Sequence, residues 1–461
     1  MFEKKYVVKG YDNIFLENLE AFYRALHSVG GYYVYRCRRG KCTSEIRLPR
    51  RDTGLVLETP GLYVSSCRLL CREDGALLPP PPTEETPIQH SSAEKGFVVG
   101  YAGDTPVYIN EEYLWRHIAI IGSTGSGKTH TAARIARCAS ALGITVVVLD
   151  WHGEYPSILS NYTEAKILAG SKLPRVGLSY EAIPLDLSLS AIESVLGLSQ
   201  FQATILGLVL GYLVEDTENR GDILGALEEI LTGTAHSNYR QTRLKTVLDK
   251  LERKNTVEAL LRTIAYLYSE RSLSPNFTRS ESEVWLALIR RIGIIASSSY
   301  SDLFIVKRKT LLDEVEENKV NIFILSTIHS PRIKKLYTLL LLQLLYTLAY
   351  TSAIGPLLVV VEEAQHIADT DTIQQILAEA RKYKLGLVLI SHTTQILPPL
   401  AQSNINTVIL HRVSETDQTI HNIPRETLEI AKKLPPGKTL LLTPINQPIL
   451  TEVRIEEPCR D

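Results

Sequence analysis

The sequence contains very little methionine and carries almost no net charge. Its 461 residues include one methionine, at position 1, and the formal net charge is −1. A scarcity of thermolabile residues such as methionine is typical of proteins from thermophiles. Because positive and negative side chains balance, the chain has no general basic field that would attract a polyanion. Any surface that binds nucleic acid must therefore be local, for example the lining of a ring or pore.

The sequence also lacks a secretion signal and a convincing membrane span. Met1–Lys5 is not followed by the apolar core of a signal peptide. The longest apolar stretch, residues 336–354, includes Gln343 and three tyrosines. Such a stretch is more typical of a buried helix than of a transmembrane helix. We therefore expect a cytoplasmic protein that associates with a membrane only through partners.

Cysteine is sparse, and most of it lies near the N-terminus. Of the six cysteines, four form two close pairs, Cys37/Cys42 and Cys67/Cys71. Their spacings are wider than those of the usual C-x₂-C zinc knuckle. A structural zinc site, two disulfides and four ordinary buried thiols are all compatible with this pattern.

The chain is longer than one typical domain, and its apolar pattern divides it. Residues 1–95 predict a small β-rich or α+β domain followed by a proline-rich linker, and residues 181–299 predict a helical insertion. Residues 96–180 and 300–445 alternate strands with helices, which indicates an α/β core with a mostly parallel, covered sheet. Residues 446–461 remain as a C-terminal tail.

The predicted N-terminal domain combines one amphipathic helix with short strands. The helix is expected over residues 15–26, and the strands over residues 32–36, 45–48 and 61–65. Basic residues concentrate around these strands, where they could contact a phosphate backbone or form a solvated face. They are Arg36, Arg38, Arg39, Lys41, Arg47, Arg50 and Arg51.

Residues 122–129 read GSTGSGKT and fit the phosphate-binding loop G-x-x-x-x-G-K-[ST]. An apolar strand precedes the loop and helical spacing follows it, which is the context that the motif requires. The glycines let backbone N–H groups point at phosphate oxygens, and the helix N-terminus adds positive charge. Lys128 would reach the β- and γ-phosphates of ATP, and Thr129 would hold Mg²⁺. The predicted nucleotide-binding residues are Gly122, Ser123, Thr124, Gly125, Ser126, Gly127, Lys128 and Thr129.

Acidic residues follow two of the predicted core strands. Asp150 and Glu154 follow the second strand of the core, and Glu362 and Glu363 follow a strand rich in valine. In an open parallel sheet the carboxyl ends of the strands face the ligand. We therefore expect Asp150 and Glu154 near the nucleotide or its metal. Glu362 would contact Mg²⁺ through water, and Glu363 would act as the catalytic base.

Polar and basic residues at further strand and helix ends complete the predicted site. Ser391 and His392 follow another core strand and could hydrogen-bond the γ-phosphate or the attacking water, or form a simple turn. Arg381 ends a predicted helix and is the first candidate for an arginine finger that acts across a subunit boundary. Arg412 is the second candidate, and either arginine could instead form a surface ion pair.

Together these segments resemble the HerA branch of the HerA/FtsK superfamily, which also contains the ATPases of conjugative type IV secretion. The resemblance rests on HIAIIGSTGSGKT, DWHGEY, EEAQ and ARKYKLGLVLIS, and it covers roughly residues 97–445. It implies a RecA-like P-loop NTPase core that assembles as a homohexameric ring and pumps double-stranded DNA. It also implies that Arg381 is the finger acting in trans, and that a NurA-like nuclease is a partner.

Two departures from the family leave the cellular role open. His392 stands where the family commonly has glutamine, and the N-terminal domain looks closer to that of conjugation ATPases than to the small β-barrel of HerA. The leading hypothesis is an ATP-dependent DNA translocase or helicase in DNA end processing and repair. The alternatives are the motor of a conjugation-like DNA-transfer apparatus, docked on a membrane channel, and a nucleotide-gated scaffold. Arg332, Lys334 and Lys335 are candidate pore-loop cations.

Overall fold

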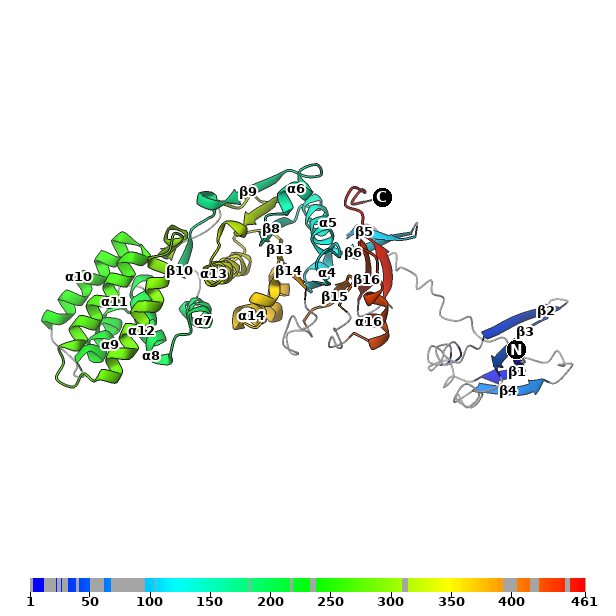
Figure 1. The fold of residues 1–461 in the computed structure, drawn as a ribbon, viewed down its shortest axis with the longest axis horizontal. Coiled ribbons are helices and arrows are strands. Elements are labelled where there is room, and N and C mark those ends of the chain that lie inside the picture. Colours follow the sequence, from blue (N-terminus) through cyan, green and yellow to red (C-terminus); the bar gives the residue numbers. More distant parts are fainter. Residues whose placement is uncertain are drawn as a thin grey trace. The chain divides into compact units, whose positions relative to one another are not determined.

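The chain divides into two compact units, residues 1–91 and 92–461 (Figure 1). The boundary falls in the polar stretch after Pro79–Pro82 that the sequence predicts to be a linker. The computed structural model describes residues 3–11, 22, 26, 32–38, 41–49, 62–67, 96–103, 105–181, 184–215, 219–232, 238–308, 314–392, 404–414, 423–443 and 448–460.

The first unit contains an antiparallel four-stranded sheet in the order β2-β3-β1-β4. The three predicted strands are present, and each is longer than predicted. The sequence pattern does not predict β1, because lysines interrupt its apolar residues. The strands are β1 (Glu3–Tyr11), β2 (Tyr32–Arg38), β3 (Lys41–Pro49) and β4 (Leu62–Cys67).

Most of the helix and of the cysteine cluster predicted in the first unit lies outside the described residues. Phe22 and Leu26 of the expected helix are helical and buried. Cys37 and Cys42 lie opposite each other in the β2–β3 ladder. The cysteine side chains of this unit, and those of its basic cluster, are not among the described residues. Zinc binding and disulfide formation at Cys37, Cys42, Cys67 and Cys71 therefore stay predictions.

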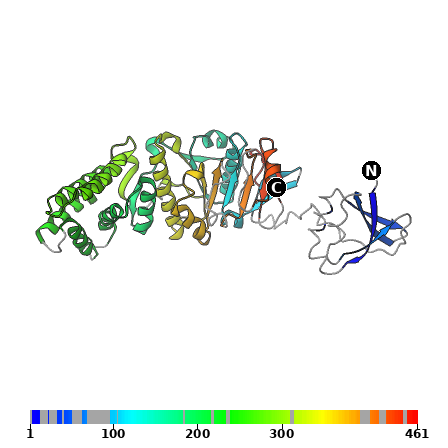
Figure 2. The same ribbon diagram turned by 60° about the horizontal axis from the view of Figure 1, so that its bottom comes forward.

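The second unit is organised around an eleven-stranded sheet in the order β6-β5-β17-β16-β15-β7-β14-β13-β8-β12-β9 (Figure 2). Neighbouring strands from β15 to β9 are parallel, and β16, β17, β5 and β6 extend the sheet in antiparallel fashion. This confirms the predicted α/β fold with a mostly parallel sheet. The strands are β5 (Gly96–Ala102), β6 (Thr105–Asn110), β7 (Ile118–Ile121), β8 (Thr145–Asp150), β9 (Ala165–Ala169), β12 (Val320–Ile324), β13 (Leu357–Val361), β14 (Leu385–Ser391), β15 (Thr407–Leu410), β16 (Lys438–Leu442) and β17 (Ile449–Glu452).

Helices cover both faces of the parallel strands, which explains why those strands read as continuous apolar runs. In β13 the odd-numbered residues join the core with α13 and α14, and the even-numbered residues join the core with α5. The apolar stretch at residues 336–354 forms most of α13, which is buried, as predicted. Among the described residues, no helix combines the length and hydropathy that crossing a bilayer demands. The helices of this layer are α4 (Glu111–Leu114), α5 (Lys128–Ala141), α6 (Tyr155–Leu159), α13 (Pro331–Tyr350), α14 (Asp371–Glu379) and α16 (Arg425–Lys432).

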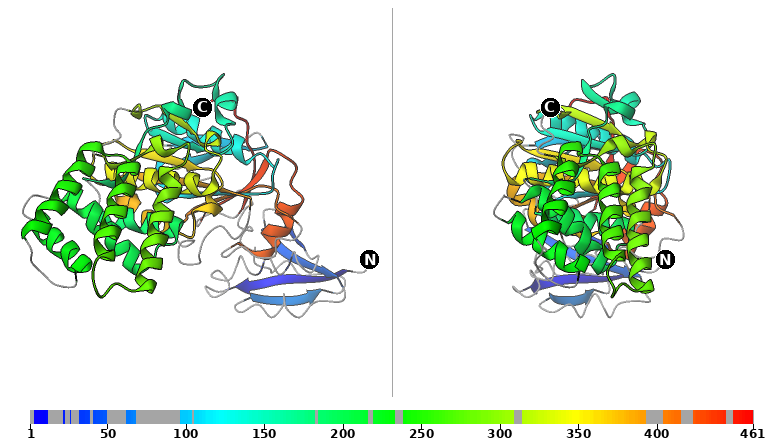
Figure 3. Two further views of the ribbon diagram at one scale, coloured as in Figure 1. Left: turned by 60° about the vertical axis from the view of Figure 1, so that its left-hand side comes forward. Right: turned by 90° about the vertical axis from the view of Figure 1, so that its left-hand side faces the viewer.

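The segment between the two halves of the core is helical, and Figure 3 shows these helices in green beside the sheet. The parallel pair β10 (Val176–Tyr180) and β11 (Phe304–Arg308) carries the chain into and out of this region. Capping boxes begin α8 at Ser199 and α12 at Thr278, so the first N–H groups of both helices are satisfied. The helices are α7 (Leu185–Leu196), α8 (Gln200–Val214), α9 (Arg220–Thr232), α10 (Asn238–Lys254), α11 (Val257–Ser272) and α12 (Arg279–Ala296).

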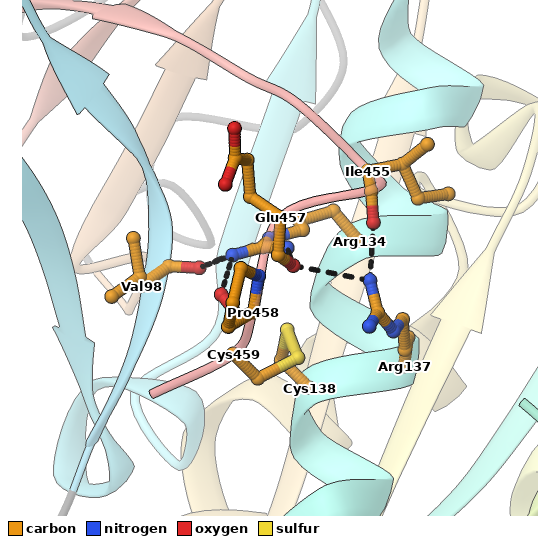
Figure 4. Close-up of a disulfide and its surroundings, with 8 residues drawn as sticks. All are labelled: Val98, Arg134, Arg137, Cys138, Ile455, Glu457, Pro458 and Cys459. Carbon is orange, nitrogen blue, oxygen red and sulfur yellow. Dashed lines mark hydrogen bonds between the residues drawn. A yellow bond between two sulfur atoms is a disulfide. The ribbon is translucent and has the colours of Figure 1, made fainter. Parts of the chain in front are cut away.

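The C-terminal segment, for which the sequence pattern predicts a tail, is part of the core. Its strand β17 pairs with both β16 and β5. Residues 453–460, which we call the C-terminal strap, then lie alongside α5, the helix that starts at the phosphate-binding loop (Figure 4). A disulfide joins Cys138 of α5 to Cys459 of the strap. The sequence pattern misses this arrangement because the residues 446–461 are too short and mixed to show a clear period.

Two arginines of α5 hold the strap through its backbone. The Arg134 side chain is fully buried, and its guanidinium donates to the carbonyls of Val98, Glu457 and Pro458 (Figure 4). Arg137 donates to the carbonyls of Ile455 and Glu457. The Val98 N–H in turn donates to the Cys459 carbonyl at 2.9 Å. The strap is therefore fixed to both α5 and β5.

Removing the Cys138–Cys459 disulfide should destabilise the second unit. The cross-link spans 321 residues of sequence, so its loss frees a very long loop in the unfolded chain. We expect the double variant C138S/C459S to lose a few kcal/mol of stability, with an upper limit of about 5 kcal/mol. Thermal unfolding with and without a thiol reductant measures this. Reductant should lower the melting temperature of the second unit in the wild type and leave that of the double variant unchanged. If reductant left the wild-type melting temperature unchanged, the prediction would be contradicted.

Candidate active site

The loop between β7 and α5 has the backbone that phosphate binding requires. Gly125 and Gly127 have φ angles of 74° and 104°, in the left-handed region that favours glycine. Gly127 is the N-cap of α5 and has no side chain, so it leaves the first N–H groups of the helix available to a ligand. The Lys128 ammonium group folds back and donates to the Ser123 carbonyl at 3.0 Å. The predicted loop thus has the backbone geometry of an anion site.

The residues that follow β15 hold the phosphate-binding loop in place through hydrogen bonds. Ser123 donates to the Arg412 carbonyl from its backbone N–H at 2.7 Å and from its hydroxyl at 3.0 Å. His411 Nδ1 donates to the Ser126 carbonyl at 2.9 Å, and the Gly437 N–H donates to the same oxygen at 3.2 Å. Because a carbonyl only accepts, His411 carries its proton on Nδ1, and Nε2 accepts from the Thr131 hydroxyl at 3.0 Å.

His411 is a neutral structural part of the site. Burial lowers its pKa to about 4, and the nearby charge of Lys128 contributes. Packing against His411 also explains why residue 122 is glycine: a Cβ there would lie 2.6 Å from the His411 Cβ atom. The sequence offers one faint signal for His411, its position directly after an apolar strand.

Asp150 serves the turn that follows β8. Its carboxylate is fully buried and accepts from the N–H groups of Gly153 at 2.7 Å, Glu154 at 3.2 Å and Tyr155 at 3.1 Å. The carboxylate therefore fixes this turn, and its expected place near the nucleotide or its metal stays a prediction. Glu154 is exposed, and its charge acts on both Lys128 and Glu362.

Glu362 lies buried at the end of β13, beside the end of β8. Its Oε2 atom accepts from the Trp151 N–H at 3.1 Å. Burial and the nearby charge of Asp150 hold the pKa of Glu362 well above its usual range. Burial lowers the pKa of Lys128, and the charges of Glu363, Glu362 and Glu154 oppose that shift. The acids after β13 and the lysine of the loop therefore lie within electrostatic reach of each other.

Glu363 occupies a left-handed backbone conformation, with φ at 51°. Such a conformation is costly for a non-glycine residue and persists only where the surroundings impose it. Its Oε1 atom accepts from His152 Nε2 at 3.2 Å, and its Oε2 atom lies 3.1 Å from His392 Nδ1 and accepts from the Gln365 amide. Burial would raise the pKa of Glu363, but the hydrogen bonds from His152 and Gln365 and the charge of His392 outweigh it, so the pKa lies below its ordinary value.

The other predicted site residues differ in how closely they approach Glu363 and the phosphate-binding loop. At the end of β14, His392 Nδ1 lies 3.1 Å from Glu363 Oε2, and the neighbouring Ser391 carbonyl accepts from the Gly122 N–H at 3.2 Å. Arg412 contributes its carbonyl to the loop. Arg381 is exposed in a short 3₁₀ helix (Ala380–Tyr383) and forms no ion pair within the described part of the chain.

Comparison with known proteins decides the family. Residues 94–345, more than half of the chain, match the family described as the central domain of helicase HerA. The chain belongs to the HerA family. It is 25% identical over 420 residues to the DNA double-strand break repair helicase HerA of Sulfolobus acidocaldarius, covering 83% of this chain and 76% of that one. It is also 25% identical over 436 residues to the HerA protein of Sulfurisphaera tokodaii, covering 87% and 79%.

Solved structures show that this HerA-family chain shares its fold with VirB4 and with a conjugative coupling protein. VirB4 of Thermoanaerobacter pseudethanolicus superposes with a TM-score of 0.54 at 16% identity, covering 78% of this chain and 97% of that one. The conjugative coupling protein TrwB superposes with a TM-score of 0.51 at 13% identity, covering 79% and 91%. The predicted P-loop NTPase fold and the predicted HerA/FtsK-type family are thus confirmed.

The donor set of this HerA-family site fits a nucleoside triphosphate with a divalent cation. The left-handed glycines and the open helix N-terminus provide N–H donors for phosphate, and Lys128 provides a charge. The Ser126 hydroxyl is buried and has no hydrogen-bond partner among the described residues. The Thr129 hydroxyl and the Glu362 carboxylate are oxygen donors of the kind that Mg²⁺ prefers. A bound cation would also stabilise the ionised form of Glu362.

Sequence reasoning missed the layer of residues around Trp151. The Trp151 ring stacks on the His366 ring, with the two ring centroids 5.3 Å apart. Lys334 Nζ lies 4.8 Å from the centroid of the Trp151 ring. Lys335 pairs with Asp369 at 3.6 Å. Lys334 and Lys335, the candidate pore-loop cations, thus have partners beside the site. Only the position of Trp151 within DWHGEY could have pointed to this layer.

Proposed function

We propose that the protein is an ATP-dependent DNA translocase or helicase. It hydrolyses ATP with Mg²⁺ and assembles as a homohexameric ring that moves double-stranded DNA during DNA end processing and repair. The observation that carries this proposal is the meeting of Lys128, Glu362 and Glu363 at the carboxyl edge of the parallel sheet, where only β14 separates β7 from β13, in a HerA-family chain. The names of its relatives, DNA double-strand break repair helicases, support the repair role.

In this proposal the loop binds ATP and the residues after β13 hydrolyse it. Lys128 binds the β- and γ-phosphates, and Glu363 accepts the proton of the attacking water. Arg381 of a neighbouring subunit stabilises charge on the γ-phosphate oxygens, a role that its exposed position permits. Thr129, and Glu362 through water, would hold Mg²⁺, which would supply charge neutralisation at the phosphates. TrwB structures with non-hydrolysable GTP and ATP analogues, which superpose with TM-scores of 0.51 and 0.50, support a nucleoside triphosphate as the ligand.

A second candidate function is the motor of a conjugation-like DNA-transfer apparatus. The shared fold with VirB4 and TrwB favours it. The two candidates differ in their partners, because a repair motor would bind a NurA-like nuclease and a transfer motor would bind a membrane channel. Capture of partners by the full-length chain separates them.

Steady-state ATP hydrolysis with and without linear duplex DNA tests the proposal. Because a translocase couples hydrolysis to movement along phosphates, we expect DNA to stimulate the wild type several-fold and high salt to remove the stimulation. Lys128→Ala should abolish hydrolysis at both conditions, since it removes the charge that binds the phosphates. Lys172→Ala, at an exposed position in the short 3₁₀ helix Gly170–Lys172, is the control for loss of a lysine. A wild-type rate of ATP hydrolysis that is the same with and without DNA would overturn the DNA-motor proposal.

A further inference from the structure

We infer that His152 is a positioning residue that orients the Glu363 carboxylate for catalysis. The inference rests on the proposed function, in which Glu363 is the general base. His152 Nε2 is the donor to Oε1 of Glu363 among the described residues, whereas Oε2 has both Gln365 and His392 as neighbours. His152 therefore sets the direction of one carboxylate oxygen, and through it the rotation of the whole group.

The backbone around His152 is fixed on both sides. The Trp151 N–H donates to Glu362 Oε2 at 3.1 Å, and the Gly153 N–H donates to Asp150 Oδ1 at 2.7 Å. The Trp151 ring is further held between His366 and Lys334. A side chain that projects from such a fixed turn can hold its partner in one geometry, because little of the turn is free to move.

The lone pairs of Glu363 leave room for a reacting water. A carboxylate offers about four acceptor directions over its two oxygens. Gln365 donates to Oε2, and His392 Nδ1 lies 3.1 Å from the same oxygen as a second donor, so the acceptor directions on that side are taken. Oε1 accepts from His152 and keeps a second direction open. The geometry assigns Oε1 as the oxygen that receives the proton, with His152 holding it in place.

His152 is suited to this role because the fold does not depend on it. Its side chain is 53% exposed, and that of Glu363 is 21% exposed. Loss of an exposed side chain costs little stability. A change in turnover on substitution of His152 would therefore report on Glu363 and not on unfolding.

The test is a pair of variants of the full chain, assayed for ATP hydrolysis with linear duplex DNA. His152→Phe keeps a ring but removes the donor, and we expect kcat to fall about tenfold with the KM for ATP unchanged, because His152 touches the base and not the nucleotide. His152→Gln keeps an N–H donor and should recover most of the turnover. His329→Phe, which replaces an exposed histidine elsewhere, should match the wild type.

A double variant separates positioning from a general structural effect. In the Glu363→Gln background the base is already lost, so His152→Phe should lower kcat no further. Equal kcat of His152→Phe and wild type would overturn the inference and leave the proposed function standing. A fall that His152→Gln does not recover, or one that persists in the Glu363→Gln background, would also overturn it. A wild type that does not hydrolyse ATP would overturn the inference and the proposed function together.

Discussion

Replacing Glu363 by glutamine should lower kcat for ATP hydrolysis by about 10²- to 10⁴-fold, the range that general-base catalysis contributes. The amide has the size of the carboxylate but cannot accept the proton of the attacking water. ATP affinity should stay close to that of the wild type, because Lys128 and the loop backbone remain in place. The expected pattern is thus a loss of turnover with retained binding.

Turnover and ATP affinity are measured separately for Glu363→Gln and compared with those of a control variant. Steady-state kinetics gives kcat, and equilibrium binding of ATP to the variant gives the affinity. Glu316→Gln replaces an exposed acid that pairs with Lys319 and Lys166 away from the loop, and it should behave as the wild type. If Glu363→Gln turned over at the wild-type rate, another group would have to be the base.

The second large effect is expected at Arg134. Arg134→Met keeps much of the volume of the side chain but removes the side-chain donor of the Val98 and Pro458 carbonyls and one of the two arginine donors of the Glu457 carbonyl. Buried groups that lose their partner cost about 1–3 kcal/mol each, so we expect a loss of about 3–5 kcal/mol in the free energy of unfolding. The C-terminal strap should become accessible to proteases before the rest of the unit unfolds.

Two companion variants test the cause of that loss. Arg134→Lys retains the charge but cannot reach several carbonyls at once, so most of the destabilisation should remain. Arg137→Met removes bonds to Ile455 and Glu457 from a half-buried position and should cost about 1 kcal/mol. Thermal and denaturant unfolding measure all three. A melting temperature of Arg134→Met equal to that of the wild type would show that the strap does not depend on this guanidinium.

Local patterns predicted much of the core and of the candidate site. The phosphate-binding loop follows from a short motif between a strand and a helix, and the strand before Glu362 follows from an unbroken apolar run. Parallel strands buried on both faces produce such runs, so periodicity alone places Glu362 and Glu363 at a strand end. The positions of these residues depend on their immediate neighbours in sequence, which is why the sequence reveals them.

Partners that are distant in sequence could not be predicted. His411 supports Ser126 across 285 residues, and Cys138 bonds to Cys459 across 321 residues. Nothing in the local sequence of either pair specifies its partner, because the sheet order brings them together. Asp150 shows a different limit: a strand end predicts where a carboxylate lies, but not that three N–H groups of its own turn will occupy it.

The cross-link between α5 and the strap has a topological consequence. It closes the chain from Cys138 to Cys459 into a covalent circle that contains the ends of β8, β13, β14 and β15 and the whole helical insertion, while the phosphate-binding loop lies before it in the chain. A single cut in the backbone anywhere on this circle opens it without releasing a fragment. Two cuts are needed before any part of the circle can leave, and even then the disulfide keeps the helix that begins at Lys128 joined to the final residues of the chain.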